Sequence, residues 1–255
     1  MKAIIIAAGM GVRLDPLTNN KPKCMLKIKE KTILQYQLDA FYANSITDIS
    51  VIKGYKKEQI KYSGIKYYIN NNYINNNILN SLFYAEDEMN ESFIGSYSDI
   101  LFESNIVGRL IKEKEDITIV VDTEWKDRYE GRTMHPIEEA EKVILNGENV
   151  VDIGKIVSSN KNIDGEFIGM LKCSKRGAKI FKEYFHKAKK EFYGKSFIRS
   201  KSFSQGYLTD FIRYLVDNGI KVSCMTIRHG WIEIDTVQDL ERAEKEWKLE
   251  EKTNE

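Results

Sequence analysis

MKAIIIAAGMGVRLDPLTNNKPKCMLK, residues 1–27, is the stretch of the sequence that predicts the fold. Lys2 to Ile6 form a β-branched apolar run, long enough for one buried strand and too short for an ordinary helix. Small residues follow directly, in Ala7 to Gly11, and they let the backbone approach a ligand without clashes from Cβ atoms. Backbone N–H groups in such a loop can form a concavity that binds an anion. The stretch therefore predicts a strand that ends in an anion-binding loop.

Two cationic side chains follow this loop. Arg13 adds a forked donor with a permanent charge, and Lys23, directly after Pro22, adds a point charge. Two cations beside a small-residue loop suit a polyphosphate, whose charge has to be neutralised before a nucleophile approaches. The loop lacks the third glycine of the dinucleotide fingerprint G-x-G-x-x-G and the Gly-Lys-Ser/Thr of a P-loop. The pattern thus indicates a polyphosphate site of another kind.

The order of strand, loop, arginine and lysine resembles the signature of the sugar-phosphate nucleotidyltransferase superfamily. That signature is A-G-x-G-x-R-L-x-P-L-T followed by P-K, and it corresponds here to Ala8 to Thr18 and to Pro22-Lys23. A glycine turn that merely joins a strand to a helix would explain Gly9 and Gly11 but not the remaining matches. The resemblance implies that Arg13 and Lys23 are catalytic and that the nucleotide is bound by Ala7, Ala8, Gly9 and Gly11.

Composition narrows the class of protein. At 255 residues the chain is long enough for one sizeable core, and 39 basic against 38 acidic side chains leave almost no net charge. This balance gives no reason to expect nucleic acid or an anionic membrane as a partner. Three cysteines, odd in number and far apart, predict reduced thiols rather than disulfides or a metal site. Because no apolar segment resembles a signal peptide or a membrane span, we expect a cytoplasmic protein without membrane insertion.

Predicted strands alternate with predicted helices in the first part of the chain. Thr32 can cap a helix with apolar residues at helical spacing, and strands are expected over 48–52 and 65–69. Such alternation predicts a mostly parallel sheet with helices on both faces, and ligands of such sheets bind beyond the carboxyl ends of the strands. The resemblance implies an α/β fold: a Rossmann-like, three-layer αβα sandwich with a mostly parallel mixed sheet, as in GT-A-like nucleotidyltransferases.

An asparagine-rich stretch, Asn70 to Asn77, reads either as a polar surface loop or as part of the nucleotide site. Asn77 can cap the helix that follows, which places amide groups and free backbone N–H groups at a helix start. Cytidylyltransferases that resemble this chain carry an N-N-x-x-S-L-like segment beside the base, and residues 77–82 here are N-I-L-N-S-L. The resemblance implies base or ribose contacts by Asn77, Asn80 and Ser81, with cytosine and uracil both open.

Two aspartates follow predicted strands and are candidate Mg²⁺ ligands. Asp99 stands after a strand over 92–97, where a carboxylate can hold the ion against a triphosphate, although a turn-capping aspartate is the alternative. Residues 231–236 alternate, so a strand there would place Glu233 and Asp235 on one face, and buried acids are costly unless paired or metal-bound. In the resembling family an E-I-D-T/S segment closes the site. The resemblance implies that Asp99 and Asp235 bind Mg²⁺.

The acceptor site is expected between these two acids. A strand over 116–121 is followed by a polar stretch, 122–132, with two aromatic residues and two arginines. Aromatic faces suit a quaternary ammonium and arginines suit a phosphate or phosphonate, whereas a surface helix–loop is the alternative. Sugar-phosphate enzymes also carry a lysine at the acceptor phosphate, in a strand comparable to 150–157. The expected acceptor contacts are Trp125, Arg132, Lys155, Glu166 and Glu233.

The chemistry implied is attack by an acceptor oxygen on the α-phosphorus of a nucleoside triphosphate, with release of pyrophosphate. Such an oxygen is already anionic, so alignment and charge neutralisation would suffice without a general base. The chain resembles bacterial choline-phosphate and 2-aminoethylphosphonate cytidylyltransferases. This implies a Mg²⁺-dependent cytidylyltransferase with CTP and a small phosphate- or phosphonate-bearing acceptor as partners. A sugar-1-phosphate nucleotidylyltransferase that makes an NDP-sugar and a non-catalytic nucleotide-binding regulator are the alternatives.

We expect one nucleotidyltransferase domain over residues 1–250 and a charged tail over 251–255. Its nucleotide-binding part would cover about 1–115 and its acceptor-binding part about 116–235. The three histidines are scattered and predict no ligand set. One or two metal ions, and a monomer or a homodimer, are all compatible with the sequence.

Overall fold

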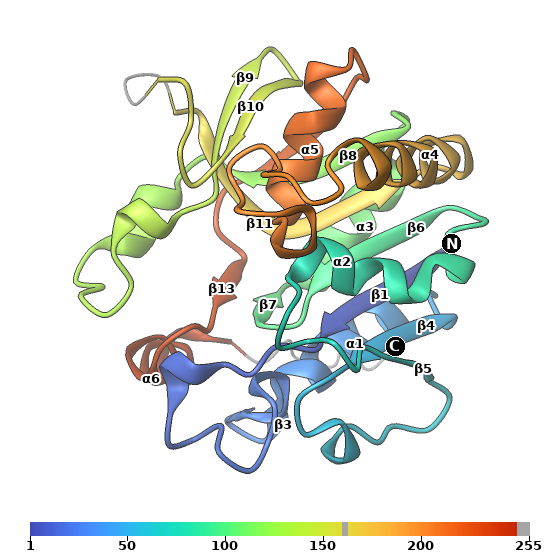
Figure 1. Cartoon of the computed structure of the whole chain (residues 1–255). Coiled ribbons are helices and arrows are strands. Elements are labelled where there is room, and N and C mark those ends of the chain that lie inside the picture. The colour runs from blue at the N-terminus through green and yellow to red at the C-terminus, as the bar shows by residue number, and fades with distance from the viewer. Residues whose placement is uncertain (160–162, 249–255) are drawn as a thin grey trace.

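A nine-stranded sheet runs through the computed structural model, which describes residues 1–159 and 163–248 (Figure 1). The charged tail expected over 251–255 lies outside the described residues. The strands of the sheet are β1 (Lys2–Ala7), β4 (Ile49–Lys53), β5 (Lys66–Ile69), β6 (Phe93–Tyr97), β8 (Ile117–Asp122), β9 (Lys142–Asn146), β10 (Asn149–Gly154), β11 (Gly165–Cys173) and β12 (Ser223–Ile227). From edge to edge they stand in the order β5, β4, β1, β6, β11, β8, β12, β10, β9.

The sheet is mixed, as expected, and its two halves differ in strand direction. Parallel pairs join β5, β4, β1 and β6, and a further parallel pair joins β8 to β12. Strand β11 runs antiparallel between β6 and β8, and β10 pairs antiparallel with both β9 and β12. The antiparallel share exceeds what a regular strand–helix alternation predicts, because β9, β10 and β11 follow one another without a crossover helix. We expected no strand at β9 or β12.

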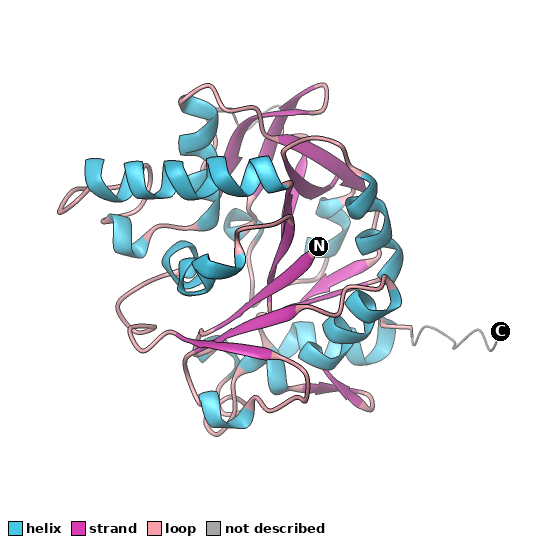
Figure 2. Cartoon of the chain, turned by 90° about the vertical axis from the view of Figure 1, so that its right-hand side faces the viewer, coloured by secondary structure: helices cyan, strands magenta, loops and turns pink. Residues whose placement is uncertain are grey.

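Helices cover both faces of the sheet (Figure 2). Ala3 and Ile5 of β1 belong to a core with the first and third helices, whereas Ile4 and Ile6 belong to a second core with the second, fourth and fifth. Side chains of a strand alternate between faces, so the uninterrupted apolar run of β1 serves both cores. This confirms the three-layer class. The helices are α1 (Ile33–Ala43), α2 (Ile78–Leu82), α3 (Ser104–Lys112), α4 (Lys175–Glu191), α5 (Leu208–Asp217) and α6 (Val237–Glu246).

A small sheet outside the main one brings two distant segments together. Strand β13 (Trp231–Glu233) pairs antiparallel with β7 (Ile100–Phe102), and Ile234 N–H donates to the Asp99 carbonyl oxygen at 2.8 Å. A third sheet consists of β2 (Lys27–Ile28) and β3 (Lys31–Thr32). The pairing of β7 with β13 places the residues that follow β6 beside those that follow β13.

Helix α6 begins directly after β13 at a capping box. Thr236 Oγ1 accepts from Asp239 N–H at 3.3 Å, and Asp239 Oδ2 accepts from Thr236 N–H at 2.8 Å. Reciprocal bonds of this kind satisfy donors that a helix start leaves free. The box confirms the helix start expected at Thr236, and it fixes the backbone next to Asp235.

Short 3-10 turns complete the fold: η1 (Val12–Leu14), η2 (Lys23–Met25), η3 (Lys57–Gln59), η4 (Phe83–Glu88), η5 (Trp125–Tyr129), η6 (Ile137–Glu139) and η7 (Phe203–Gln205). The three cysteines are buried and free, which agrees with reduced thiols. Among the described helices, none combines the length and the apolar character needed to cross a membrane.

Candidate active site

A cavity of about 340 Å³ lies beyond the carboxyl end of β1. Its wall is built from the loop after β1, the end of β6, the start of β11, residues of β13 and directly after it, and segment 123–141, which connects β8 to β9. Asn77, Ile78, Lys155 and Tyr207 complete the wall. Segments from distant parts of the sequence therefore meet at one end of the sheet. This is the place where open α/β sheets bind ligands, and where the loop after β1 was expected.

The two glycines of that loop line the cavity for different reasons. Gly11 adopts a left-handed backbone with φ of +64°, and a Cβ there would lie 3.0 Å from Lys23 Cβ. The backbone itself thus requires glycine at this position. A Cβ at Gly9 would meet nothing within 4 Å, so packing of the chain does not require glycine there. Gly9 leaves room for a ligand to approach the backbone, while Ala7 and Ala8 are buried behind the cavity wall.

Asp99 and Asp235 converge on one ammonium group. Lys23 Nζ lies 2.7 Å from Asp99 Oδ2 and 2.6 Å from Asp235 Oδ1. The pairing of β7 with β13 positions both aspartates, since each stands next to a paired strand. Asp99 Oδ1 is buried and has no hydrogen-bond partner within residues 1–159 and 163–248. The structure therefore brings the two predicted metal ligands together around Lys23 and leaves one carboxylate oxygen unsatisfied.

The charges of this group are mutually stabilised. Burial alone would lower the pKa of Lys23, but the attraction of Asp99 and Asp235 outweighs it, so its pKa lies above the ordinary lysine value. Burial alone would raise the pKa of Asp235, but Lys23, His135 and Arg13 hold it well below the usual range of a carboxyl. Lys23 stays cationic and Asp235 stays anionic at neutral pH.

Arg13 and His135 complete the contacts of Asp235. Arg13 Nη2 donates to Asp235 Oδ2 at 2.7 Å, and His135 Nδ1 lies 3.1 Å from the same oxygen. His135, Glu233 and Asp235 each offer a ligand atom within 4.8 Å of the others, so the structure brings His135 beside the two acids, which the scattered positions of the histidines did not predict. The long polar stretch between two strands was a signal, because long loops in compact domains are usually functional. No local sequence pattern, however, indicates that segment 123–141 folds back against β13.

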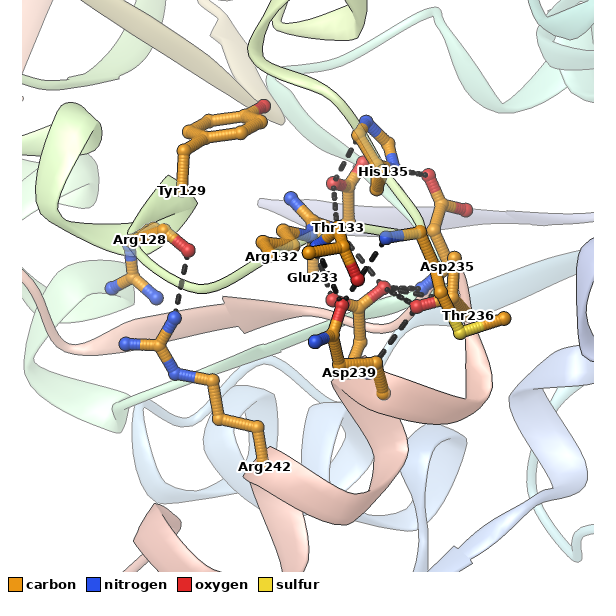
Figure 3. A network of polar contacts seen from close by, with 12 residues as sticks. Arg128, Tyr129, Arg132, Thr133, His135, Glu233, Asp235, Thr236, Asp239 and Arg242 are labelled. Atoms are coloured by element: carbon orange, nitrogen blue, oxygen red, sulfur yellow. Dashed lines mark hydrogen bonds and ion pairs between the residues drawn. The ribbon is translucent and has the colours of Figure 1, made fainter.

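Arg132 does not line the cavity. It lies instead in a network of polar contacts with Glu233 and Asp239 (Figure 3). Its Nε and Nη2 donate to the two oxygens of Asp239 at 2.6 and 3.0 Å, and Nη2 also donates to Glu233 Oε2 at 3.0 Å. Asp239 in turn accepts from Asp235 N–H at 3.0 Å. The guanidinium expected at an acceptor phosphate is thus occupied by two carboxylates. It connects segment 123–141 to the start of α6.

Trp125 is likewise absent from the cavity wall. It is 3% exposed and packs against Tyr129 and Ala140 in a separate small core, with 5.8 Å between the Trp125 and Tyr129 ring centroids. The aromatic face that we expected to meet a quaternary ammonium is covered by protein. Trp231 is the tryptophan that does line the cavity.

The other predicted acceptor residues, Lys155, Glu166 and Glu233, do line the cavity. Lys155 Nζ pairs with Glu139 Oε2 at 2.6 Å, and burial raises the pKa values of Glu166 and Glu233. Glu139, Glu141 and Tyr97 also line this part of the cavity and were not predicted. Tyr97 ends β6, two residues before Asp99, whereas no local sequence pattern marks Glu139 or Glu141.

Of the three residues expected near the base, Asn77 lines the cavity and caps α2, where its side chain accepts from Ile78 N–H. Asn80 Nδ2 instead donates to the Phe203 carbonyl oxygen at 2.7 Å, and the buried Ser81 Oγ accepts from Asn70 Nδ2 at 2.9 Å. These two side chains hold α2 against neighbouring segments. The structure does not bring them to the cavity.

Residues 2–85 match the model of the family described as "Nucleotidyl transferase". The chain is 31% identical over 252 residues to the CTP:phosphoglutamine cytidylyltransferase of Campylobacter jejuni, with 94% of this chain and 98% of that protein covered. It is 36% identical over 108 residues to the choline-phosphate cytidylyltransferase of Streptococcus pneumoniae, or 41% of this chain and 47% of that one. A solved CTP:phosphocholine cytidylyltransferase from Streptococcus pneumoniae superposes with a TM-score of 0.72, at 23% identity, over 95% of this chain and 97% of its own. That superposition shows a shared fold.

Proposed function

The chain belongs to the nucleotidyl transferase family, and we propose that it is a Mg²⁺-dependent cytidylyltransferase. It would join CMP from CTP to a small phosphorylated or phosphonate acceptor and release pyrophosphate. The full-length similarity to a relative named for CTP and phosphoglutamine supports both the base and the class of acceptor. The observation that carries the proposal is the junction of Lys23 with Asp99 and Asp235, beside a glycine loop that leaves room for a ligand.

The reaction requires alignment and charge neutralisation rather than proton removal. An acceptor phosphate oxygen is already anionic when it attacks the α-phosphorus, and the bond to the leaving pyrophosphate breaks on the opposite side. Arg13 and Lys23 line the cavity together with the glycine loop. Their charges would attract the triphosphate there and stabilise the negative charge that accumulates on the leaving group. The raised pKa of Lys23 keeps its ammonium charged throughout.

The carboxylates fit a Mg²⁺ ion by their donor chemistry. This ion favours oxygen ligands and binds through one or two carboxylates together with substrate phosphates. Asp99 has an unsatisfied buried oxygen, and Asp235 stays ionised at neutral pH. When bound by these two residues, Mg²⁺ would supply charge neutralisation and orientation for the phosphates. Lys23 would then help to balance the negative charge of the acid pair and the nucleotide.

The test is pyrophosphate release with CTP, UTP, GTP, ATP and dTTP, each against phosphocholine, phosphoethanolamine, 2-aminoethylphosphonate and hexose 1-phosphates, over a Mg²⁺ titration. We expect turnover with CTP and an amine-bearing acceptor, and loss of turnover in EDTA. Turnover with a hexose 1-phosphate alone would contradict the acceptor class. Silence with every pair would contradict the enzyme reaction itself.

Replacement of Asp235 tests the metal assignment. We expect Asp235→Asn to lower turnover by about 100-fold or more and to raise the Mg²⁺ concentration required for half-maximal rate. Asp87→Asn is the matched control, because Asp87 is an exposed aspartate that does not line the cavity. An Asp235→Asn enzyme with an unchanged Mg²⁺ dependence would remove Asp235 from the metal site.

A further inference from the structure

Two of the carboxyl groups that line the cavity, those of Glu141 and Glu166, have no part in the chemical steps of the proposed reaction. Glu141 Oε2 accepts from the Tyr97 hydroxyl at 3.2 Å, and the Thr209 hydroxyl lies 3.4 Å from Glu141 Oε1. Glu166 is 4% exposed, and its Oε1 accepts from the Tyr129 hydroxyl at 2.6 Å. An ionised carboxylate can accept about four hydrogen bonds, so both groups retain acceptor capacity toward the cavity.

These two acids differ from their neighbours in lacking a direct ion pair. Glu139 pairs with Lys155 at 2.6 Å, and Glu233 pairs with Arg132 at 3.0 Å. Within the described parts of the chain, no lysine, arginine or histidine nitrogen lies within ion-pair distance of Glu141 or Glu166. From farther away, the charge of Lys155 opposes the rise in the pKa of Glu141, and the charges of Arg132 and Arg128 oppose the rise in the pKa of Glu166.

A buried carboxylate without a cationic partner is costly, and such groups are normally paired or neutral. Burial raises the pKa of Glu141 to about 8 and also raises that of Glu166. A bound cation would supply the direct ion pair that both groups lack.

The aromatic faces around the cavity favour one kind of cation over another. A quaternary ammonium has no N–H and is recognised by open aromatic faces. The Arg128 guanidinium already makes a cation–π contact with the Trp231 ring, 4.6 Å from the ring centroid, and Lys155 Nζ makes one with the Tyr207 ring at 5.2 Å. The other two aromatic residues of the cavity wall, Tyr97 and Phe167, pack edge-to-face against each other with 5.9 Å between ring centroids, and Trp125 is buried elsewhere. Hydrogen-bond acceptors are therefore better placed than an open aromatic cage to receive a cation here.

On the basis of the proposed function, we propose that the acceptor carries an N–H-bearing ammonium group, which Glu141 and Glu166 bind by charge-assisted hydrogen bonds. The phosphate or phosphonate of the acceptor then points toward Arg13 and Lys23, which line the same cavity. The two acids are specificity-determining residues: they select an ammonium with N–H donors over its trimethylated form and over an uncharged group of the same length. A site built around hydrogen-bond acceptors rejects a ligand that lacks the donors.

The first experiment compares three acceptors with one phosphonate group: 2-aminoethylphosphonate, its N,N,N-trimethyl derivative and propylphosphonate, each with CTP and Mg²⁺. The corresponding phosphate esters, phosphoethanolamine, phosphocholine and propyl phosphate, form a second series. We expect kcat/KM to be about 10- to 100-fold higher for the primary amine than for either other member of its series. A trimethylated or uncharged acceptor that matches or exceeds the amine would overturn the inference while leaving the cytidylyltransferase proposal intact. Silence with all six acceptors would contradict the proposed function itself.

The second experiment assigns the selectivity to its residues. We expect Glu166→Gln and Glu141→Gln to raise KM for the amine and to bring its kcat/KM within a few-fold of that for the uncharged acceptor. Glu138→Gln is the control, since Glu138 is an exposed residue of the same segment and does not line the cavity. Thermal unfolding and CTP binding show whether each variant is folded. Folded Glu141 and Glu166 variants that keep the full preference for the amine would overturn the inference. If both variants misfold, the comparison of acceptors with the unaltered enzyme still tests the inference.

Discussion

Arg132→Lys tests whether Arg132 binds the substrate or instead holds other residues of the site in position. The sequence predicted that Arg132 contacts the acceptor, whereas in the structure its guanidinium lies between Glu233 and both oxygens of Asp239. Lysine keeps the positive charge but loses the planar fork that binds one carboxylate through two parallel bonds. The substitution therefore removes the geometry of the contact without leaving the two acids unneutralised.

The expected cost follows from the bonds lost. Arg132 makes three charge-assisted hydrogen bonds of 2.6, 3.0 and 3.0 Å, and its side chain is 7% exposed, so solvent screens them little. A lysine ammonium can replace about one of them, and each bond to a charged group contributes about 1.5–3 kcal/mol. We expect a loss of about 3 kcal/mol in the free energy of unfolding. In a domain of this size that corresponds to a fall in Tm of about 6–12 °C.

Catalysis should change along with stability. Asp239 also accepts a hydrogen bond from the backbone N–H of Asp235. If the Asp239 side chain is less well fixed, the backbone position of Asp235 is therefore less well fixed too. We expect kcat to fall by about tenfold or more, because the charged groups around the phosphates lose their alignment. The acceptor KM should change less than kcat, since Arg132 does not line the cavity.

Thermal unfolding and steady-state kinetics with saturating CTP measure both effects. Arg242→Lys is the matched control, because Arg242 joins the same segment to α6 through the Arg128 carbonyl oxygen and is more exposed. It should lower the free energy of unfolding by less than about 1 kcal/mol. An Arg132→Lys enzyme with unchanged Tm and an acceptor KM raised tenfold would refute the reasoning and restore Arg132 as an acceptor ligand.

Three further substitutions probe other parts of the structure. Asp152 is fully buried, which by itself would raise its pKa, but Arg199 and Arg213 outweigh burial and lower its pKa to about 2. The ionised Asp152 therefore stabilises the fold fully above pH 4, and this stabilisation is lost as the pH falls toward 2. Asp152→Asn should therefore lower the free energy of unfolding at pH 7 by about 2 kcal/mol and reduce the fall of Tm between pH 4 and 2. An unchanged fall of Tm would show that Asp152 is not its cause. Gly11→Ala should cost about 1–2 kcal/mol in urea unfolding, because φ of +64° is left-handed. Gly9→Ala should leave the unfolding midpoint unchanged but raise the KM for CTP about tenfold; an unchanged KM would mean that the loop does not contact the nucleotide.

Local chemistry explains what could be predicted from the sequence. A strand of β-branched residues, a glycine at a left-handed turn and the helix caps at Thr32 and Thr236 all depend on neighbours within a few residues. The resemblance of the first 23 residues to a family signature added the order of the elements that follow. The placement of Asp99 beside Asp235 agrees with the predicted metal pair, and their role as ligands stays a prediction.

Contacts between distant segments explain what could not be predicted. The type of residue at Trp125 and Arg132 suits a ligand, but only the fold determines that the tryptophan is buried in a cluster with Ala140 and that the arginine binds Asp239. His135 and Glu141 carry no local signal, because their partners come from β13 and from β6.

The sequence by itself determined the class of fold, the glycine loop and the cations beside it, because their conformations and charges are properties of short segments. Only the tertiary structure decided which acids are neutralised by the protein and which remain open to a ligand. Pairing and burial depend on the side chains that surround a group in space, and a carboxylate near Lys23 has a different environment from one near Tyr97. The sequence therefore indicated Lys155, Glu166 and Glu233 as residues of the cavity, but only the fold shows which of these acids has a cationic partner.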